Sequence, residues 1–308
     1  MNKIENRSEL IFLYDVKDAN PNGDPADENK PRIDEETGVN IVTDVRLKRT
    51  IRDYLYKFKK KEIFVRKIED KQGNIQDAKT RAKDFQNNPK KIISTCIDVR
   101  LFGGTIPIST GKAKESSITF TGPVQFKMGR SLNKVELKYI KGTGAFASGE
   151  EKRQKSFREE WILPFSLICF YGIINENAAE ETNLTEADVD LLLEGMWNGT
   201  KNLISRSKMS HTPRVLLKVD YKKNNFHIGD LDKLIKYTSD MPDEKVRDIS
   251  ELTLDMNMFT GTLKKYKEAI SLVNYKIDER MQLSADGKKL IFTEILKKVG
   301  IKGRELSI

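Results

Sequence analysis

The apolar positions of this chain follow two patterns, short continuous runs and a helical spacing. Residues 10–16 (LIFLYDV) form a short, nearly continuous apolar run of strand-forming residues, typical of a central strand buried on both faces. From residue 47 onward the apolar positions follow a helical spacing, on Leu47, Ile51, Tyr54, Leu55 and Phe58. Thr43 suits the N-cap of that helix. The opening third therefore predicts a buried strand followed by an amphipathic helix.

The rest of the chain continues this mixture. Further strands are predicted at 117–127, 161–174 and 214–221, and further helices at 90–101 and 184–204. Without insertions the order is strand, helix, strand, strand, helix, strand, the ferredoxin-like β-α-β-β-α-β arrangement of RNA-recognition folds. We therefore expect an α+β palm over residues 1–221. Its insertions are a finger region at about 59–116 and a basic arm at about 128–160, and residues 222–308 are expected to be a helical extension packed on the palm.

Residues 17–40 show no apolar period and are rich in turn dipeptides such as Asn-Pro, Asn-Gly and Asp-Pro. Loops of this length inside a compact domain are usually functional. Four carboxylates in or beside the loop could hold a hard cation and support metal-assisted hydrolysis: Asp15, Asp18, Asp24 and Asp27. The alternative, which the neighbouring Pro and Gly residues favour, is that they are ordinary turn residues.

Composition narrows the function classes. The 308 residues include two cysteines and two histidines, which leaves little room for a disulfide framework or a Cys/His metal site. No apolar run approaches the ~20 residues of a membrane-spanning helix, and the N-terminus lacks a signal-peptide core. We therefore expect a soluble, cytoplasmic chain with no membrane partner.

Charge is distributed in blocks. The net charge is +9, and three segments are strongly basic: residues 44–67, with ten basic and three acidic side chains, and residues 126–158 and 201–223. Residues 176–194 hold seven acids and no base. Such blocks can be solvated surface, but three basic segments in one chain favour a polyanion-binding protein that also meets a protein partner.

Motifs of common enzymes are absent. The sequence has no Walker or dinucleotide glycine loop, no HExxH helix and no nucleophile elbow, and it lacks the stacking aromatics of RNA-recognition motifs. RNA would therefore be held through its backbone. On the predicted first helix Lys48 and Arg52 form a row beside the apolar stripe, and Arg46 and Arg49 are expected on the outward side. His211 is expected at the surface or on a sugar.

Five segments in order resemble the Cas-seven family of CRISPR-associated proteins, in the RAMP superfamily. They are LIFLYDVKDANPNGDP, PRIDEETGVNIVTDVRLKRTIRDYL, VRLFGG, TGPVQF and SRSKMSHTPRVLLKV. The resemblance covers about residues 8–221. It is nearest to the type I-B (Csh-like) branch, with the type I-C branch next.

The resemblance implies a crRNA-binding backbone subunit of a type I Cascade complex. Copies would stack along the CRISPR guide RNA and contact neighbouring copies and other Cascade subunits. Target DNA would be recognised by pairing with the guide, and thumb hairpins would reach across the neighbouring copies' RNA.

Carried over by position, the family's RNA contacts fall on three groups of residues and on Arg130 of the basic arm. They are the loop residues Asn20, Asn22 and Gly23, the helix residues Thr43, Arg46, Lys48, Arg49 and Arg52, and, before the last palm strand, Arg206, Lys208 and Met209. The resemblance implies no catalytic activity and no cofactor. A metal-dependent endoribonuclease of the type III kind, using Asp24 or Asp15, is the alternative.

Overall fold

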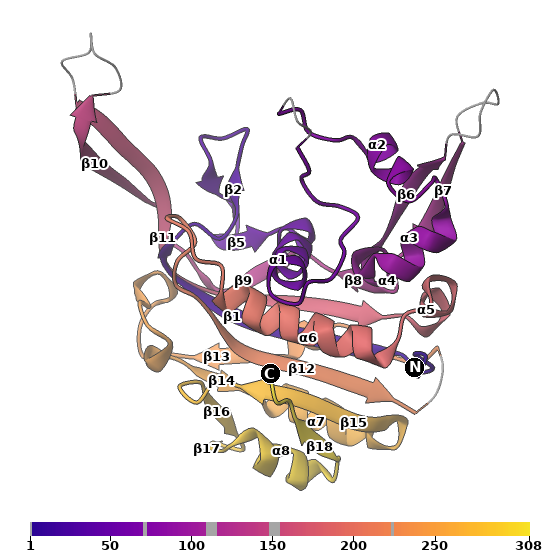
Figure 1. The fold of residues 1–308 in the computed structure, drawn as a ribbon. Coiled ribbons are helices and arrows are strands. Elements are labelled where there is room, and N and C mark those ends of the chain that lie inside the picture. The colour runs from indigo at the N-terminus through magenta and orange to yellow at the C-terminus, as the bar shows by residue number, and fades with distance from the viewer. Residues whose placement is uncertain (1, 70–72, 109–115, 148–154, 223–224) are drawn as a thin grey trace.

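A ten-stranded sheet forms the centre of the molecule (Figure 1). The computed structural model describes residues 2–69, 73–108, 116–147, 155–222 and 225–308. Eight strands follow one another in the order β18 (Gly303–Glu305), β15 (Ile270–Ile277), β12 (His211–Tyr221), β1 (Ser8–Ala19), β11 (Lys155–Ile174), β9 (Gly129–Lys134), β5 (Val39–Val42) and β4 (Ile33–Asp34). β8 (Val124–Phe126) and β10 (Lys138–Ala147) pair with β11.

Strand β1 is buried on both faces, which confirms the prediction from its continuous apolar run. Phe12 and its even-numbered neighbours pack with helices α1 (Asp44–Lys57) and α6 (Glu186–Lys201). Leu13 faces the opposite side, where it joins the core of the C-terminal lobe, which is residues 225–308. The sheet therefore lies between two helices on one side and that lobe on the other (Figure 1).

The two palm helices begin where their caps predict. The Thr43 side chain accepts a hydrogen bond from the Arg46 main-chain N–H at the start of α1. Thr185 and Asp188 form a capping box at the start of α6. α1 and α6 then pack against each other, with Ile51 and Met196 in the shared core.

The finger region has a small core of its own. It contains helices α2 (Ala78–Lys83), α3 (Pro89–Thr95) and α4 (Ile97–Phe102), and the strand pair β6 (Gly103–Ile108) and β7 (Ser116–Thr121). The single helix expected over 90–101 is divided, because the backbone of Cys96 is extended. Gly103, at φ 66°, ends α4.

A hairpin of β10 and β11 projects beyond the sheet (Figure 1). Strand β11 has 20 residues and runs from the hairpin into the sheet, where it pairs with β1, β8 and β9. The arm expected at 128–160 must therefore be corrected at its start, because residues 129–134 form sheet strand β9.

The expectation of a helical C-terminal extension must be corrected, because strands are present there together with the helices. Residues 225–308 contribute β15 and β18 to the central sheet and build a second, four-stranded sheet. Its strands are β13 (Lys236–Thr238), β14 (Thr253–Asp255), β16 (Gln282–Ala285) and β17 (Lys288–Lys289), and its helices are α7 (Asn257–Lys265) and α8 (Phe292–Val299). Phe259 and Ile295 anchor these helices in the core.

Short elements complete the fold. They are strands β2 (Gly23–Asp24) and β3 (Lys30–Pro31), helix α5 (Glu176–Thr182), and the 3-10 turns at Leu231–Leu234, Asp243–Lys245, Ile249–Glu251 and Lys267–Ala269. None of the described helices has the length and apolar character to cross a membrane.

Candidate nucleic-acid interface

The loop after β1 is fastened to the start of α1. The side-chain oxygen of Asn22 accepts hydrogen bonds from the main-chain N–H and the hydroxyl of Thr43, both over 2.9 Å. Gly23 lies so close to Asn29 that a Cβ at this position would be 2.6 Å from the Asn29 main-chain oxygen. Asn20 donates to that same oxygen over 2.7 Å. The three loop residues expected from sequence thus form one ordered turn.

The segment before β12 meets this turn. Val16 of β1 pairs with His211 of β12, so the chain leaving β1 and the chain entering β12 emerge side by side. Asn20 donates its main-chain N–H to the Ser207 oxygen over 2.8 Å, and the Lys208 ammonium donates to the Asn20 oxygen over 2.7 Å. Sheet pairing therefore brings together two candidate segments that are far apart in sequence.

The cations of helix α1 have different surroundings. Arg49 is 57% exposed and pairs with Asp53 on its own helix over 2.9 Å. Lys48 is buried, with its ammonium 3.0 Å from both Asp44 and Gln125. Arg52 donates to the fully buried Asp98 over 3.1 Å, joining the palm helix to the finger. The expected row of Lys48 and Arg52 is therefore engaged inside the protein, and Arg49 is the outward cation.

Arg46 is half-buried rather than outward. One of its terminal nitrogens donates to the Thr50 hydroxyl over 3.1 Å, while its Nε is buried without a partner among the described atoms. Burial lowers the pKa of the Arg46 guanidinium, and burial together with Arg46 lowers the pKa of Lys208 to about 8. The charge of Arg46 thus acts on Lys208, and within the described residues neither side chain forms an ion pair.

His211 lies behind these two cations. The residue is 5% exposed, and its ring stacks on Tyr14 at a centroid distance of 5.8 Å. Burial, followed by the charges of Lys208 and Arg46, lowers the pKa of His211 to about 3. The expectation of a surface histidine is wrong, because β12 begins at His211 itself, ahead of the apolar run that predicted the strand.

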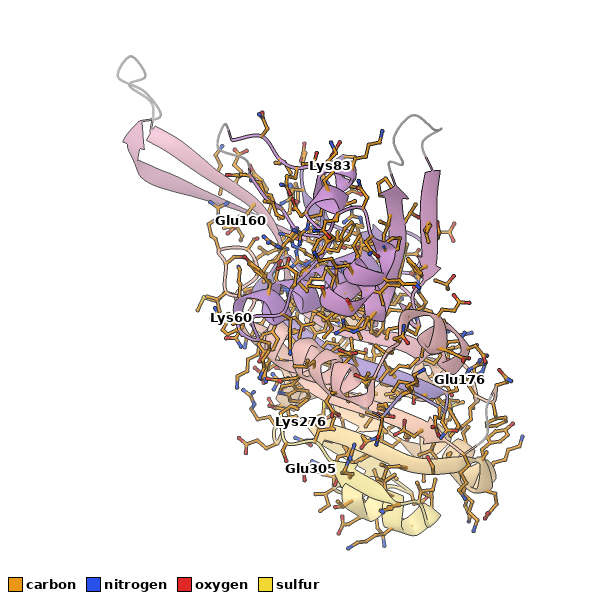
Figure 2. All side chains as sticks on the ribbon, turned by 45° about the vertical axis from the view of Figure 1, so that its right-hand side comes forward. Lys60, Lys83, Glu160, Glu176, Lys276 and Glu305 are labelled. Atoms are coloured by element: carbon orange, nitrogen blue, oxygen red, sulfur yellow. The ribbon has the colours of Figure 1, made fainter. Side chains whose placement is uncertain are left out.

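The base of the β10–β11 hairpin borders the same region, and Figure 2 shows Glu160 there. Glu160 lies 3.7 Å from Arg206. Trp161 carries the Lys30 ammonium over its ring at 5.2 Å. Met209 is 64% exposed beside Arg206 and Lys208, where it can meet a ligand.

Arg130 is exposed on β9 and donates to Asp34 over 3.1 Å. That contact ties β9 to the turn between β4 and β5. The side chain therefore lies on the sheet rather than on a projecting arm.

The four carboxylates considered for metal chemistry do not gather. Asp15 is buried with Arg214 at 2.7 Å, and burial raises its pKa to about 6 despite that partner. Asp24 accepts the Ala26 N–H at 3.0 Å, as turn residues do, and Asp27 pairs with Lys30. Over the described part of the chain, no group of three or more His, Cys, Asp or Glu residues could hold a metal ion.

Sequence reasoning missed Arg32. Its guanidinium donates to the main-chain oxygens of Gly23 and Asn22, at 2.7 and 3.2 Å, and so supports the turn from inside. Arg32 lies in a segment with no apolar period, so no local signal distinguishes it from a surface arginine.

Structural comparison shows the class of fold. The fold is similar to a chain of a "CRISPR RNA-guided surveillance complex, pre-nicking", with TM-score 0.57, 11% identity and coverage of 96% of this chain and 99% of the other. A second similar chain, from a "CRISPR RNA-guided surveillance complex", gives TM-score 0.51 and 14% identity, over 96% and 98% of the two chains. These likenesses show a mixed α+β fold with a large central sheet.

The sequence comparisons name the family. The family model for CRISPR-associated protein Cas7 matches residues 6–257. CRISPR-associated protein Cas7 of Haloferax volcanii is 34% identical over 306 residues, covering 90% of this chain and 88% of that protein. The chain belongs to the Cas7 family of CRISPR-associated proteins.

Proposed function

We propose that this chain is the non-catalytic, crRNA-binding backbone subunit of a type I Cascade surveillance complex. The observation that carries the proposal is the pair of half-buried cations Arg46 and Lys208, with no carboxylate in ion-pair contact among the described residues. Buried positive charge without a counter-charge favours an anionic ligand. Two exposed arginines lie on the same segments, Arg49 on α1 and Arg206 before β12, and each has one carboxylate partner at the surface, Asp53 and Glu160 respectively.

We also infer that the palm is ferredoxin-like. Strands β12, β1, β11 and β9 are neighbours in that order and pair antiparallel. Helices α1 and α6 follow β1 and β11 and cover one face. This is the layout that the β-α-β-β-α-β order produces, and its loops carry the candidate contacts at one end of the sheet.

Partners and subtype extend the proposal. Guide RNA would lie on the loops around Asn22 and Lys208, with neighbouring copies along it, other Cascade subunits at its ends and target DNA recognised through the guide. Family membership and the surveillance-complex fold support this role. We propose the I-B branch, with I-C next, as the subtype, on the resemblance of the segments quoted from the sequence.

The experiment is size-exclusion chromatography with light scattering, on the protein alone and with a CRISPR-repeat-containing RNA, in magnesium and in EDTA. We expect large protein–RNA assemblies with intact RNA in both buffers. RNA shortened only in magnesium, with cleavage abolished in Asp24→Asn, would establish the nuclease alternative instead. Absence of co-elution at moderate salt would refute the proposal.

A charge-matched pair of variants localises the RNA-binding surface. Arg46→Ala with Lys208→Ala is expected to weaken binding of every RNA sequence alike, because phosphate contacts carry no sequence information. The salt dependence should also become shallower, by about 0.7 in log–log slope for each phosphate of a single strand that the protein no longer neutralises. Lys264→Ala with Lys297→Ala removes the same charge from exposed positions of the C-terminal lobe and should leave both quantities unchanged.

A further inference from the structure

The environment of His211 is unusual for a buried histidine. The residue is the first of β12 and pairs with Val16, and its ring stacks on the ring of Tyr14 of β1. Lys208 precedes it by three residues, and Arg46 of α1 lines the same small cavity as the ring. That cavity has a volume of about 10 Å³, room for one water molecule.

Unpartnered polar atoms converge at this point. Both ring nitrogens of His211 and the Nε of Arg46 are buried without a hydrogen-bond partner of normal geometry among the described atoms. Buried polar groups are paired in the great majority of cases, and each exception has a cost in free energy. A phenylalanine would fill the place above Tyr14 without that cost, so packing alone does not account for a histidine.

The charges around the ring keep it neutral. The charged groups that act on it are Lys208, from the segment before β12, and Arg46, from α1; Tyr14 of β1 is the other titratable group in contact. Both cations oppose a third positive charge. A neutral imidazole has one donor and one acceptor nitrogen. The cavity that both residues line has room for one water, which could accept the Arg46 Nε–H and donate to the acceptor nitrogen. The main chain of Lys208 acts on the ring as well.

We propose that His211 is a positioning residue, which holds Arg46 and Lys208 in the arrangement that receives a phosphate of the guide RNA. The inference rests on the proposed function and adds a residue that need not touch RNA. The ring lies beside the cavity that Arg46 lines and three residues after Lys208, so it orients the guanidinium of one cation and fixes the main chain that carries the other. It adds no charge of its own.

The test compares His211→Phe with His211→Gln in equilibrium binding to a CRISPR-repeat-containing RNA over a range of salt concentrations. Phe keeps the stacking on Tyr14 and removes the polar atoms, so affinity should fall about tenfold, the equivalent of one hydrogen bond to a charged group. The salt dependence should become shallower. Gln restores a donor and an acceptor and should recover most of the affinity.

His227→Phe is the matched control. His227 contacts Arg7, which pairs with Glu176, and Figure 2 shows Glu176 on the other side of the view from Glu160, past the far end of β11. This variant should bind RNA as the unsubstituted chain does. Thermal unfolding of each variant checks that the fold is kept. If the Phe variant unfolds, His211→Asn replaces it, because its shorter side chain stops short of Arg46 and should show the same weakening.

Each result has one meaning. Equal affinity and equal salt dependence in a folded His211→Phe variant and the unsubstituted chain would overturn the inference and leave the proposed function standing. A fall in affinity that Gln does not recover would overturn the positioning role, because Gln supplies both a donor and an acceptor. Failure of the unsubstituted chain to bind RNA would overturn the proposed function, and the inference with it.

Discussion

The Lys208 ammonium donates a hydrogen bond to the main-chain oxygen of Asn20 over 2.7 Å, across 188 residues of sequence. A second main-chain oxygen, that of Pro21, lies at 3.4 Å. Carbonyl oxygens orient an ammonium without neutralising it, whereas a carboxylate would cancel its charge. The hydrogen bond therefore fixes the position of a cation and leaves its charge available to a ligand.

RNA affinity should depend on pH through Lys208. Burial lowers its pKa from 10.5 to about 8, so the ammonium loses its proton as pH rises through that value. We expect affinity to fall between pH 7 and 9, as measured by equilibrium binding at constant salt. Lys208→Arg keeps its charge throughout this range and should give a flat profile. A wild-type profile as flat as that of the variant would contradict this role for Lys208.

Folding stability, in contrast to RNA affinity, should increase as pH rises above about 8. Because the pKa of Lys208 is about 8 in the folded protein and 10.5 in the unfolded chain, the unfolded state binds more protons between these values. The contribution of Lys208 to the free energy of unfolding therefore rises with pH between about 8 and 10.5. Chemical unfolding at pH 7.5 and 9.5 measures it, and Lys208→Arg should remove this part of the pH dependence.

Arg52 and Arg49 should separate stability from binding. Arg52→Ala leaves the carboxylate of Asp98 buried, with the N–H groups of Phe64 and Val65 as its remaining partners, and should cost about 3 kcal/mol of unfolding free energy. Arg49→Ala removes an exposed cation and should change stability by less than about 0.5 kcal/mol while weakening RNA binding. Thermal unfolding and RNA titration of both variants test the division. Equal destabilisation by the two would contradict it.

Gly23→Ala should disrupt the turn after β1. The added Cβ would lie 2.6 Å from the Asn29 main-chain oxygen, so the backbone must shift, at a cost of about 1–3 kcal/mol. Because Asn22 and Thr43 share this turn, RNA affinity should fall as well. Gly261→Ala in α7 meets no atom within 4 Å and should be neutral or stabilising by about 0.5–1 kcal/mol. The comparison needs only unfolding curves and one binding isotherm for each variant.

Asp15 should make the protein less stable as pH rises from 4 to 6. Burial raises its pKa from 3.8 to about 6, so between these values the folded state binds more protons than the unfolded state. The free energy of unfolding then decreases with pH in that interval. Asp15→Asn cannot titrate, and Arg214 keeps Asp278 as a partner. The stability difference between variant and wild type should therefore shift in favour of the variant from pH 4 to pH 6.

The sequence predicted those strands and helices whose position is decided by neighbouring residues along the chain. The apolar run around Phe12 predicted a doubly buried strand, and Thr43 marked the first turn of the helix that follows it. These features are decided within a few residues of the chain. The periodic pattern also indicated which face of the first helix would be buried, and Leu47, Ile51 and Leu55 do lie in the core.

Non-local partners were out of reach of that reasoning. Lys48 and Arg52 have their polar contacts with Gln125 and Asp98, which follow them by 77 and 46 residues. A helical wheel cannot distinguish a cation that faces RNA from one that faces a buried carboxylate on another element. The strands of the C-terminal lobe escape local patterns for a related reason: those of its own sheet have two to four residues, and β18 is held by pairing with β15 rather than by a pattern of its own.

The length of strand β11 sets how far the hairpin projects from the sheet. At about 3.3 Å per residue, its 20 residues amount to roughly 65 Å of one continuous strand. The same strand is both a central member of the sheet and one side of the projecting hairpin. Because its sheet part is fixed by pairing with β1, the number of residues beyond that part decides the reach of the hairpin. Removing two residues from each strand of the hairpin would shorten that reach by about 7 Å and keep every side chain on its face. Distance from the palm is thus a quantity that evolution or an engineer can change in discrete steps.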